Sequence, residues 1–326
     1  MRPTYCCDVA WTSDLGGGLT FFSKRPSSTV ALEVGRHSPW MSRLLQELGH
    51  EVIVANPRKV HLISQNETKN DRVDAERLAR LARVDPQLLH PVKHRRKDTQ
   101  VALAIIRSRD LIVSQRTGLI NSVRGQVKAM GGSMPGGHTG SFHLLLEHVP
   151  EDLHVALAPV LEMIGFFSER IRHYDNLVDE LARDVFPETE ILRQVWGVGA
   201  LSALTYVLTV ETPERFPSSR VLGSYFGLRP RQDQSGGVDK QLRVTKAGDP
   251  LMRKLLVQCA HRILCDAAPD TDLKRWGTQL AARGGQAAKK RAVIAVARKL
   301  AVLLHRLWVT DAVYEPLRNL EEPLSA

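Results

Sequence analysis

Apolar residues near the start of the chain form two short runs with a helix-like segment between them. Thr29–Val34 is almost entirely apolar, and Glu51–Ala55 is the second such run. Runs of this length suit strands that are buried on both faces. Between them, Ser38 is a helix cap, Pro39 suits the first helical position and Gly49 suits the end of the helix. The order strand, helix, strand favours a right-handed parallel crossover.

The middle of the chain shows longer helical patterns. Residues 96–130 read as one mostly helical stretch, and a 3.5-residue repeat follows before Phe186-Pro187. The apolar positions of that repeat are Val160, Ile164, Phe167, Ile171, Tyr174, Val178, Leu181 and Val185. A sustained heptad predicts a coiled-coil seam. The helix is expected to pair within or between chains, or to pack singly in a bundle.

A second globular region begins after this heptad. Residues 192–204 resemble a helix-hairpin-helix whose turn contains Gly197 and Gly199. Such a turn leaves backbone N–H groups free at the start of the second helix, where they hold a DNA phosphate. A plain connection between two helices is the alternative reading of this segment.

Arg229–Gly237 is a polar, glycine-rich segment that we expect to be a loop, with a short strand and a helix from Asp249-Pro250 after it. Ser235 precedes two glycines, so an exposed nucleophile is one interpretation and a turn serine is the other. Arg229, Arg231 and Lys246 are close enough in sequence to bind a phosphate beside it.

The net charge of the chain indicates the class of partner that it binds. The 326 residues include 45 Lys and Arg against 35 Asp and Glu, for a net charge of +10 and a pI near 9.7. The excess is concentrated in residues 93–128 and 283–306, and the second stretch contains no acid. This distribution favours a phosphate-binding surface, although a single basic helix can simply be a solvated face.

Two acids at the start of a predicted helix carry the candidate chemistry. Asp71 and Asp74 share a helix face with apolar residues that follow at helical spacing. A carboxylate turned toward a core must be paired, protonated or bound to a metal, and Mg²⁺ prefers oxygen ligands. Helix capping is an equally good interpretation of this window.

Glu33 is a third candidate acid. It lies in the first predicted strand, where burial is costly, unless it ends the strand and reaches solvent. Carboxyl ends of parallel strands form sites in α/β sheets, so Glu33 is expected to converge with Asp71 and Asp74.

Three segments together resemble one family, the DEDD transposases of bacterial insertion sequences (the insertion sequence 110, 1111, 116 and 902 group). The resemblance runs from about Thr29 to Arg318. The segments are Val30–Gly35, Lys69–Ala75 and a C-terminal series formed by Gly197–Gly199, Gly227–Pro230, Ser235–Gly237 and Thr245–Gly248.

The resemblance implies a fold class. It predicts an α/β RuvC-like (ribonuclease H-like) domain over residues 1–130, incomplete at its N-terminal edge, and a coiled-coil helical region over residues 141–186. A mostly α transposase domain with a helix-hairpin-helix follows over residues 187–318.

The resemblance also implies residue roles. Glu33, Asp71 and Asp74 match the second, third and fourth metal-binding acids, with Mg²⁺ as the expected cation. Ser235 matches the family's serine, which attacks a DNA phosphodiester to form a covalent phosphoserine link. The expected partners are element-end and target DNA, a guide RNA and further copies of the chain in a dimer or tetramer.

The first acid is where this chain departs from the family pattern. Asp8 sits on a strand-like Tyr5–Ala10, but only residues 9–32, 24 in all, separate it from Glu33. Within it, Asp14–Ser28 is too short and too glycine-rich for the two strands of the family's hairpin, and we interpret this as an internal loss or a frameshift. Asp8 is assigned as the first metal acid because the first strand of a RuvC-like sheet neighbours the glutamate strand.

These observations predict a cytoplasmic DNA transposase with no membrane segment. Two alternatives remain open from the sequence. One is a catalytically impaired, nucleic-acid-binding remnant of such an enzyme, and the other is a RuvC-like metal-dependent nuclease that forms no serine intermediate.

Overall fold

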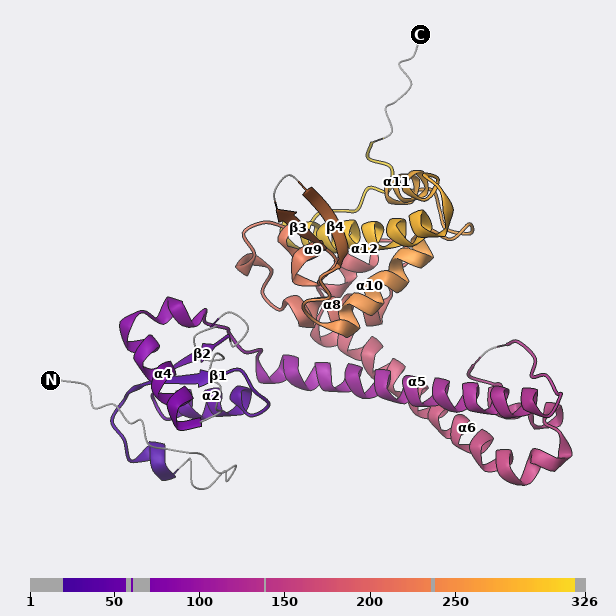
Figure 1. The fold of residues 1–326 in the computed structure, drawn as a ribbon, viewed down its shortest axis with the longest axis horizontal. Helices are drawn as coiled ribbons and strands as arrows, with labels where there is room; N and C mark the ends of the chain where they lie inside the picture. Colours follow the sequence, from indigo (N-terminus) through magenta and orange to yellow (C-terminus); the bar gives the residue numbers. More distant parts are fainter. Residues whose placement is uncertain (1–19, 57–59, 61–70, 138, 236–237, 320–326) are drawn as a thin grey trace, which may run out of the picture. The chain divides into compact units, whose positions relative to one another are not determined.

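The computed structural model describes residues 20–56, 60, 71–137, 139–235 and 238–319, and only the backbone of residues 71–72, 232–235 and 238–241. The chain forms two compact units, Met1–Arg96 and Lys97–Ala326, which are drawn in Figure 1. The first unit contains β1 (Thr29–Glu33), α2 (Ser38–Glu47), β2 (Glu51–Ala55), α4 (Asp71–Val84) and the 3₁₀ turn η1 (Pro86–Leu89).

The predicted strand–helix–strand unit is confirmed. β1 and β2 pair in parallel, from Thr29 opposite Glu51 to Glu33 opposite Ala55. Pro39 lies in the first turn of α2, and Gly49 follows the helix at φ +83°. Ser38 is the first helical residue rather than the cap, and its hydroxyl bonds the backbone of Gly35.

The two strands differ in burial. Ile53, Val54 and Ala55 of β2 are buried, whereas the three central residues of β1 are only half-buried. The segment after η1 covers β2, since Val92 donates to the carbonyl of Val54. Within the described residues β1 has β2 as its only strand neighbour, so the expectation of a β1 buried on both faces is not met there.

The second unit opens with two long helices. α5 (Lys97–Ala129) confirms the predicted helical stretch, and α6 (Glu151–Glu180) packs along it, as Figure 1 shows. Arg109 pairs with Asp175 and Arg116 donates to Ser168, so the helices run antiparallel. The short 3₁₀ turns η2 (Phe142–Leu144) and η3 (Leu146–His148) precede α6, and the π-helical turn η4 (Leu181–Val185) follows it.

The seam of α6 keeps the predicted 3.5-residue spacing but half of its positions are different residues. Ile164, Ile171 and Val178 are buried as expected. The same spacing continues through the buried residues Leu161, Ser168 and Ala182 and through Asp175, which is half-buried. Val160, Phe167, Tyr174 and Leu181 are also half-buried, and Val185 is exposed. The apolar pattern missed this register because Ser168 and Asp175 are polar residues with partners on α5.

The rest of the second unit is a mostly helical body around one large apolar core. Its elements are α7 (Thr189–Arg193), α8 (Ala200–Val210), the 3₁₀ turn η5 (Pro213–Arg215), α9 (Val221–Tyr225), β3 (Pro230–Ser235), β4 (Val238–Val244), α10 (Pro250–Ile263), α11 (Asp272–Ala281) and α12 (Gly285–Thr310). α8 is buried over most of its length, and the Tyr206 hydroxyl donates to the carbonyl of Ala301 on α12 at 2.6 Å.

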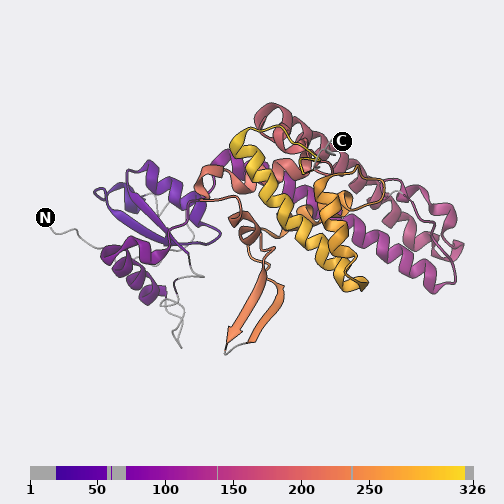
Figure 2. The ribbon, with the colours of Figure 1, turned by 90° about the horizontal axis from the view of Figure 1, so that it is seen from above.

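The expectation of a loop over Arg229–Gly237 is wrong for its described part. Pro230–Ser235 is a strand that pairs antiparallel with Val238–Val244, up to Ser235 opposite Val238. Figure 2 shows this hairpin projecting from the helices of its unit. A Gly-Gly pair between two strand-like segments is itself a hairpin signal, and the polar composition of β3 obscured it.

Two glycines fix the base of the hairpin. Gly227 has φ +70°, and a Cβ there would lie 2.3 Å from the carbonyl oxygen of Ala247. Gly248 has φ +73°, and its Cβ would lie 2.0 Å from the carbonyl oxygen of Tyr225. The two segments therefore approach more closely than any other residue type allows, and Lys246 N donates to the Gly227 carbonyl at 3.1 Å.

We expect Gly227→Ala to destabilise the protein by about 2–4 kcal/mol, from the left-handed backbone and the backbone clash combined. Urea unfolding followed by circular dichroism measures this free energy. Gly118→Ala is the matched control because Gly118 lies in α5 with open space around it, and it should stabilise by about 0.5–1 kcal/mol. Equal unfolding free energies for the two variants would contradict the assigned role of Gly227.

Candidate metal site and nucleic-acid interface

The helix that carries Asp71 and Asp74, α4, lies against the sheet of the first unit. Leu78 is buried beside Ile53 and Ala55, and Leu81 and Ala82 pack on the same cluster. The predicted apolar face of α4 is therefore confirmed. Asp74 lies one helical turn before Leu78, so this face carries a carboxylate next to the core.

Asp74 has the one anomalous carboxylate among the described acids. Its residue is half-buried, but its Oδ1 atom is shielded from water and finds no hydrogen-bond partner in the described part of the chain. A buried carboxylate oxygen normally has a partner, since leaving it without one is costly. A cation would satisfy it, so this residue fits a divalent metal.

Glu33 is the last residue of β1 and is exposed, which confirms the solvent-reaching alternative. It stands at the carboxyl end of a parallel strand, where α/β sheets place their sites. Asp71 begins α4, but its side chain lies outside the described set, as does all of Asp8. Among the described side chains, no three of His, Cys, Asp and Glu gather closely enough to hold a metal ion, so the four-acid cluster stays a prediction.

Part of the first basic stretch has an internal role. Arg109 pairs with Asp175, and Arg116 donates to Ser168 at 3.1 Å and to Thr139 at 3.2 Å. These guanidinium groups hold α6 against α5, and they are directed to protein partners rather than to a phosphate. The second stretch keeps most of its cations, such as Lys289, Lys290 and Arg298, exposed on α12.

The hairpin places the candidate nucleophile away from its predicted helpers. The backbone of Ser235 ends β3, and its side chain lies outside the described set. Arg229 and Lys246 come together at the other end of the hairpin, because Thr245 N donates to the Arg229 carbonyl at 3.0 Å. Arg231 is exposed on the strand between them and Ser235.

The segment predicted as a helix-hairpin-helix joins α7 to α8. Gly197 has φ +86°, and a Cβ there would lie 3.2 Å from the carbonyl oxygen of Cys259. Gly199 is the extended N-cap of α8, so the first N–H groups of that helix have no partner within it. The two helices and their turn are therefore present, and the phosphate-binding role stays a prediction.

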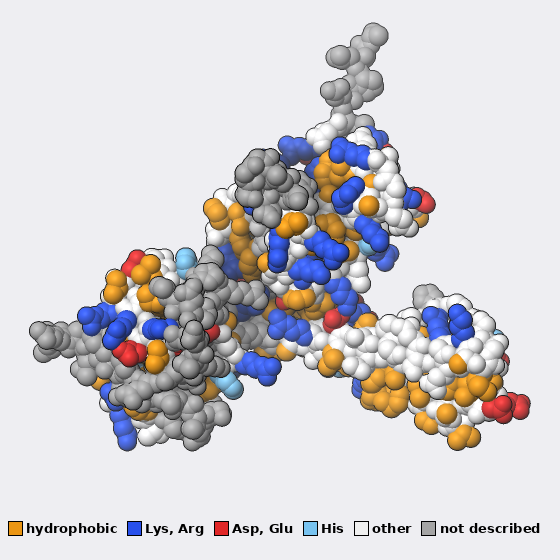
Figure 3. Space-filling model, viewed as in Figure 1, with side chains coloured by type: hydrophobic (Ala, Val, Ile, Leu, Met, Phe, Trp, Pro, Cys, Tyr) orange, Lys and Arg blue, Asp and Glu red, His pale blue; other side chains and the backbone are white. Residues whose placement is uncertain are grey.

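Four side chains that the sequence did not single out as a site converge on α12. Arg220, Trp276, Arg298 and Lys299 line one groove of the second unit, together with the predicted Arg229. Figure 3 shows Lys and Arg side chains gathering over the elements that carry this groove. The basic run 283–306 was a signal for Arg298 and Lys299, but nothing in the sequence joins Arg220 and Trp276 to them.

Comparison with known proteins identifies the class to which this chain belongs, which is that of the DNA transposases. The model of the transposase IS116/IS110/IS902 family matches residues 189–273, and a transposase model of the DEDD type matches residues 20–131. This chain belongs to that transposase family and acts in DNA transposition and recombination.

Two curated relatives support the assignment. The transposase for insertion sequence element IS1328 of Yersinia enterocolitica is 31% identical over 74% of this chain and 72% of its own length. The transposase for insertion sequence element IS1111A of Coxiella burnetii is 29% identical over 76% of this chain and 68% of its own length.

The match to the DEDD model implies a RuvC-like fold for the N-terminal part, DNA as a partner and dependence on a divalent metal. That model extends to residue 131, beyond the compact unit that ends at Arg96. The predicted limits 1–130, 141–186 and 187–318 stay predictions. None of the described helices is long and apolar enough to cross a lipid bilayer.

Proposed function

We propose that this transposase cuts and rejoins DNA through Ser235, with Mg²⁺ held by Asp8, Glu33, Asp71 and Asp74. The observation that carries the metal assignment is the shielded Asp74 Oδ1, which lacks a partner among the described residues on the core-facing side of α4. Glu33, at the end of β1, and Asp71, one turn before Asp74, are positioned on the elements that pack together there.

In this proposal Ser235 forms a covalent bond to the DNA phosphate while the strand is open. Its Oγ attacks a phosphorus atom, the P–O bond to the departing sugar breaks, and a phosphoserine link forms. The serine proton passes to solvent, and the departing sugar oxygen takes up a proton. Because the phosphodiester energy is retained in the link, a new strand's hydroxyl can reverse the step without nucleotide hydrolysis. The bound metal would polarise the phosphate and stabilise the departing oxygen.

The acids and the serine belong to different compact units. The reaction requires them to meet at one phosphate, either in one chain or between two copies. Copies of the chain are proposed to associate as a dimer or tetramer, supported by Val155, Met163 and Phe166, which are exposed apolar residues on α6.

DNA is held by the second unit in this proposal. The α8 N-terminus behind Gly197 and Gly199 offers backbone N–H groups to a phosphate. Arg229, Arg231 and Lys246 supply cations along the hairpin and at its base. A guide RNA and a cytoplasmic location complete the proposal, and the RNA is supported by the net charge of +10.

We expect strand exchange to require a divalent cation. Exchange on a plasmid that carries the gene with its flanking DNA should stop in EDTA and return with Mg²⁺, because the bound cation would polarise the phosphate and stabilise the departing oxygen. Mg²⁺ should also raise the unfolding temperature, with a stabilisation of about 2.7 kcal/mol at a hundred times its Kd.

The same experiment separates the alternatives. Exchange that continues in EDTA would contradict the metal assignment. DNA binding with neither exchange nor a thermal shift in Mg²⁺ would identify a non-catalytic remnant. Metal-dependent cleavage without rejoining would identify a nuclease.

A further inference from the structure

The groove on α12 has the composition of a site for an unpaired nucleotide. It has a volume of about 400 Å³, within the range of single-ligand sites rather than of a duplex-sized channel. Its lining combines four cations with one indole ring, and no acidic residue lines it in the described structure. Arg220, Arg298 and Lys299 have no ion-pair partner among the described residues.

Two close helix approaches build the groove. A Cβ at Gly223 of α9 would lie 2.7 Å from Cγ of Arg298, so α9 rests on the stem of that arginine. A Cβ at Gly277 of α11 would lie 2.5 Å from Cγ2 of Val296, so α11 lies directly against α12. Glycine at both positions places α9 and α11 on the two sides of the α12 turn that carries the cations.

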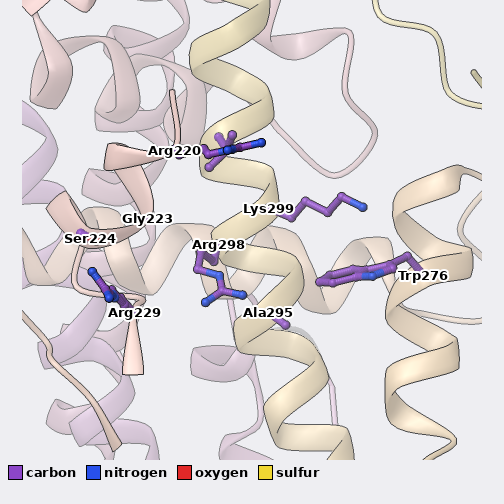
Figure 4. A pocket seen from close by; sticks show the side chains of 9 residues that line it. Arg220, Gly223, Ser224, Arg229, Trp276, Ala295, Arg298 and Lys299 are labelled. Atoms are coloured by element: carbon purple, nitrogen blue, oxygen red, sulfur yellow. The ribbon is translucent and has the colours of Figure 1, made fainter. Parts of the chain in front are cut away.

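The indole ring is oriented within this groove. Trp276 is half-buried, and the Lys299 Nζ atom lies 4.4 Å from its ring centroid. Figure 4 shows Trp276 reaching from α11 toward α12, with Lys299 extending on the same side of α12 and Arg298 and Arg229 on its other side in this view. A ring with guanidinium groups across from it presents a stacking surface and phosphate partners at once.

We propose that this groove binds one unpaired nucleotide of a DNA or RNA strand, with its base replacing Lys299 over the Trp276 ring and its phosphates on Arg220, Arg298 and Lys299. A duplex hides the faces of its bases, so a stacking ring selects single-stranded nucleic acid. The groove also adjoins the hairpin, since Arg229 directly precedes β3. Six strand residues span about 20 Å, so β3 separates Ser235 from Arg229 of the groove by about that length.

The test measures binding rather than chemistry. Fluorescence anisotropy in Mg²⁺ would follow a labelled 20-nucleotide DNA, the same sequence as RNA, and the DNA duplex, all with Ser235→Ala protein. Trp276→Ala should weaken binding to a single strand by about 5- to 100-fold and to the duplex by less than about twofold. Trp276→Phe should restore most of the affinity, because it keeps an aromatic face.

Salt dependence provides a second, independent readout. Arg298→Gln and Lys299→Gln should each reduce the slope of log K against log [salt] by about 0.7 for a single strand. Arg306→Gln is the matched control, because Arg306 is exposed on the same helix outside the groove, and its slope should change less. If Trp276→Ala does not fold, judged by circular dichroism, the Trp276→Phe and Arg298→Gln proteins carry the test.

The outcomes decide the site separately from the catalytic proposal. Tighter binding of either single strand than of the duplex, lost in Trp276→Ala, supports the nucleotide site. The strand that binds more tightly identifies DNA or RNA as the source of the nucleotide. Equal losses for strand and duplex in Trp276→Ala, or full affinity in that folded variant, would overturn it. Because Ser235 is absent from every protein tested, these results do not depend on whether Ser235 is the nucleophile.

Discussion

Asp74→Asn protein is expected to lose DNA strand exchange by at least about 100-fold while it still binds DNA. Removing a residue that only hydrogen-bonds a metal ligand already costs about 10- to 100-fold in metal affinity or activity. Removing the ligand itself should cost more. DNA binding persists because the cations and helix ends that are proposed to hold DNA lie in the second unit. Plasmid exchange and a DNA mobility shift measure the two properties on the same preparation.

Stability separates this role from helix capping. The Asp74 carboxylate oxygen is shielded and lacks a partner in the described chain, which is costly for a charged group. Asn carries no charge and removes this cost, so metal-free Asp74→Asn protein should be at least as stable as the parent. A carboxylate that served only the helix dipole would instead cost about 0.3–1 kcal/mol when neutralised, with exchange intact. That pair of results would refute the metal assignment.

Glu76→Gln is the control for the same helix. Glu76 pairs with Arg80 on the solvent side of α4, and exposed pairs contribute at most about 1 kcal/mol. Exchange should therefore be unchanged in this variant. A loss similar to that of Asp74→Asn would mean that α4 tolerates no charge change, whichever face carries it.

Ser235→Ala is expected to abolish strand exchange completely. Removal of a serine nucleophile costs up to about 10⁶-fold in turnover in hydrolases, and the proposed mechanism has no other route to a rejoined product. Affinity for DNA should stay within about twofold, since the hydroxyl is one polar group on a cationic surface. Ser218→Ala is the matched control, an exposed serine in the same unit.

Exchange that survives in Ser235→Ala would eliminate the serine mechanism and leave direct attack by water or by a sugar hydroxyl. Loss of exchange in both serine variants would instead indicate a general defect of the second unit. Unfolding temperatures distinguish a folding defect from a chemical one. Ser235 ends β3 at the far end of the hairpin from the close packing at Gly227, so Ser235→Ala should leave the unfolding temperature unchanged.

Local signals in the sequence predicted the order of elements in the described part of the first unit. The apolar runs, Pro39 and Gly49 predicted the strand–helix–strand order, and the spacing of Leu78, Leu81 and Ala82 predicted which face of α4 meets the sheet. These features depend on contacts between residues close in sequence or on strictly periodic patterns, and both are visible without coordinates.

The errors came from polar residues with partners far away in the sequence. Ser168 belongs to the α6 seam because Arg116 of α5 donates to it, and no periodic count of apolar residues includes a serine. β3 reads as a loop because its residues are polar, although β4 supplies its hydrogen bonds. A side chain's apolar character predicts burial, but a polar side chain's position depends on a partner that the local sequence does not contain.

The groove illustrates the same limit for a site. Arg220, Trp276 and Arg298 are brought together by two helix approaches that depend on Gly223 and Gly277. A glycine that permits close packing looks the same in the sequence as one that merely interrupts a helix. The basic run on α12 therefore predicted charge, and only the fold shows which of its cations face a ring.

In the proposed mechanism Ser235 becomes covalently joined to DNA in a step that requires the metal-binding acids. This link can be detected by mass spectrometry of proteolytic peptides after reaction with plasmid DNA in Mg²⁺ and nuclease trimming. We expect a nucleotide attached to the peptide that contains Ser235, formed in Mg²⁺ and missing both in EDTA and in Asp74→Asn protein. Rejoined DNA with no nucleotide on that peptide at any time during the reaction would contradict this mechanism.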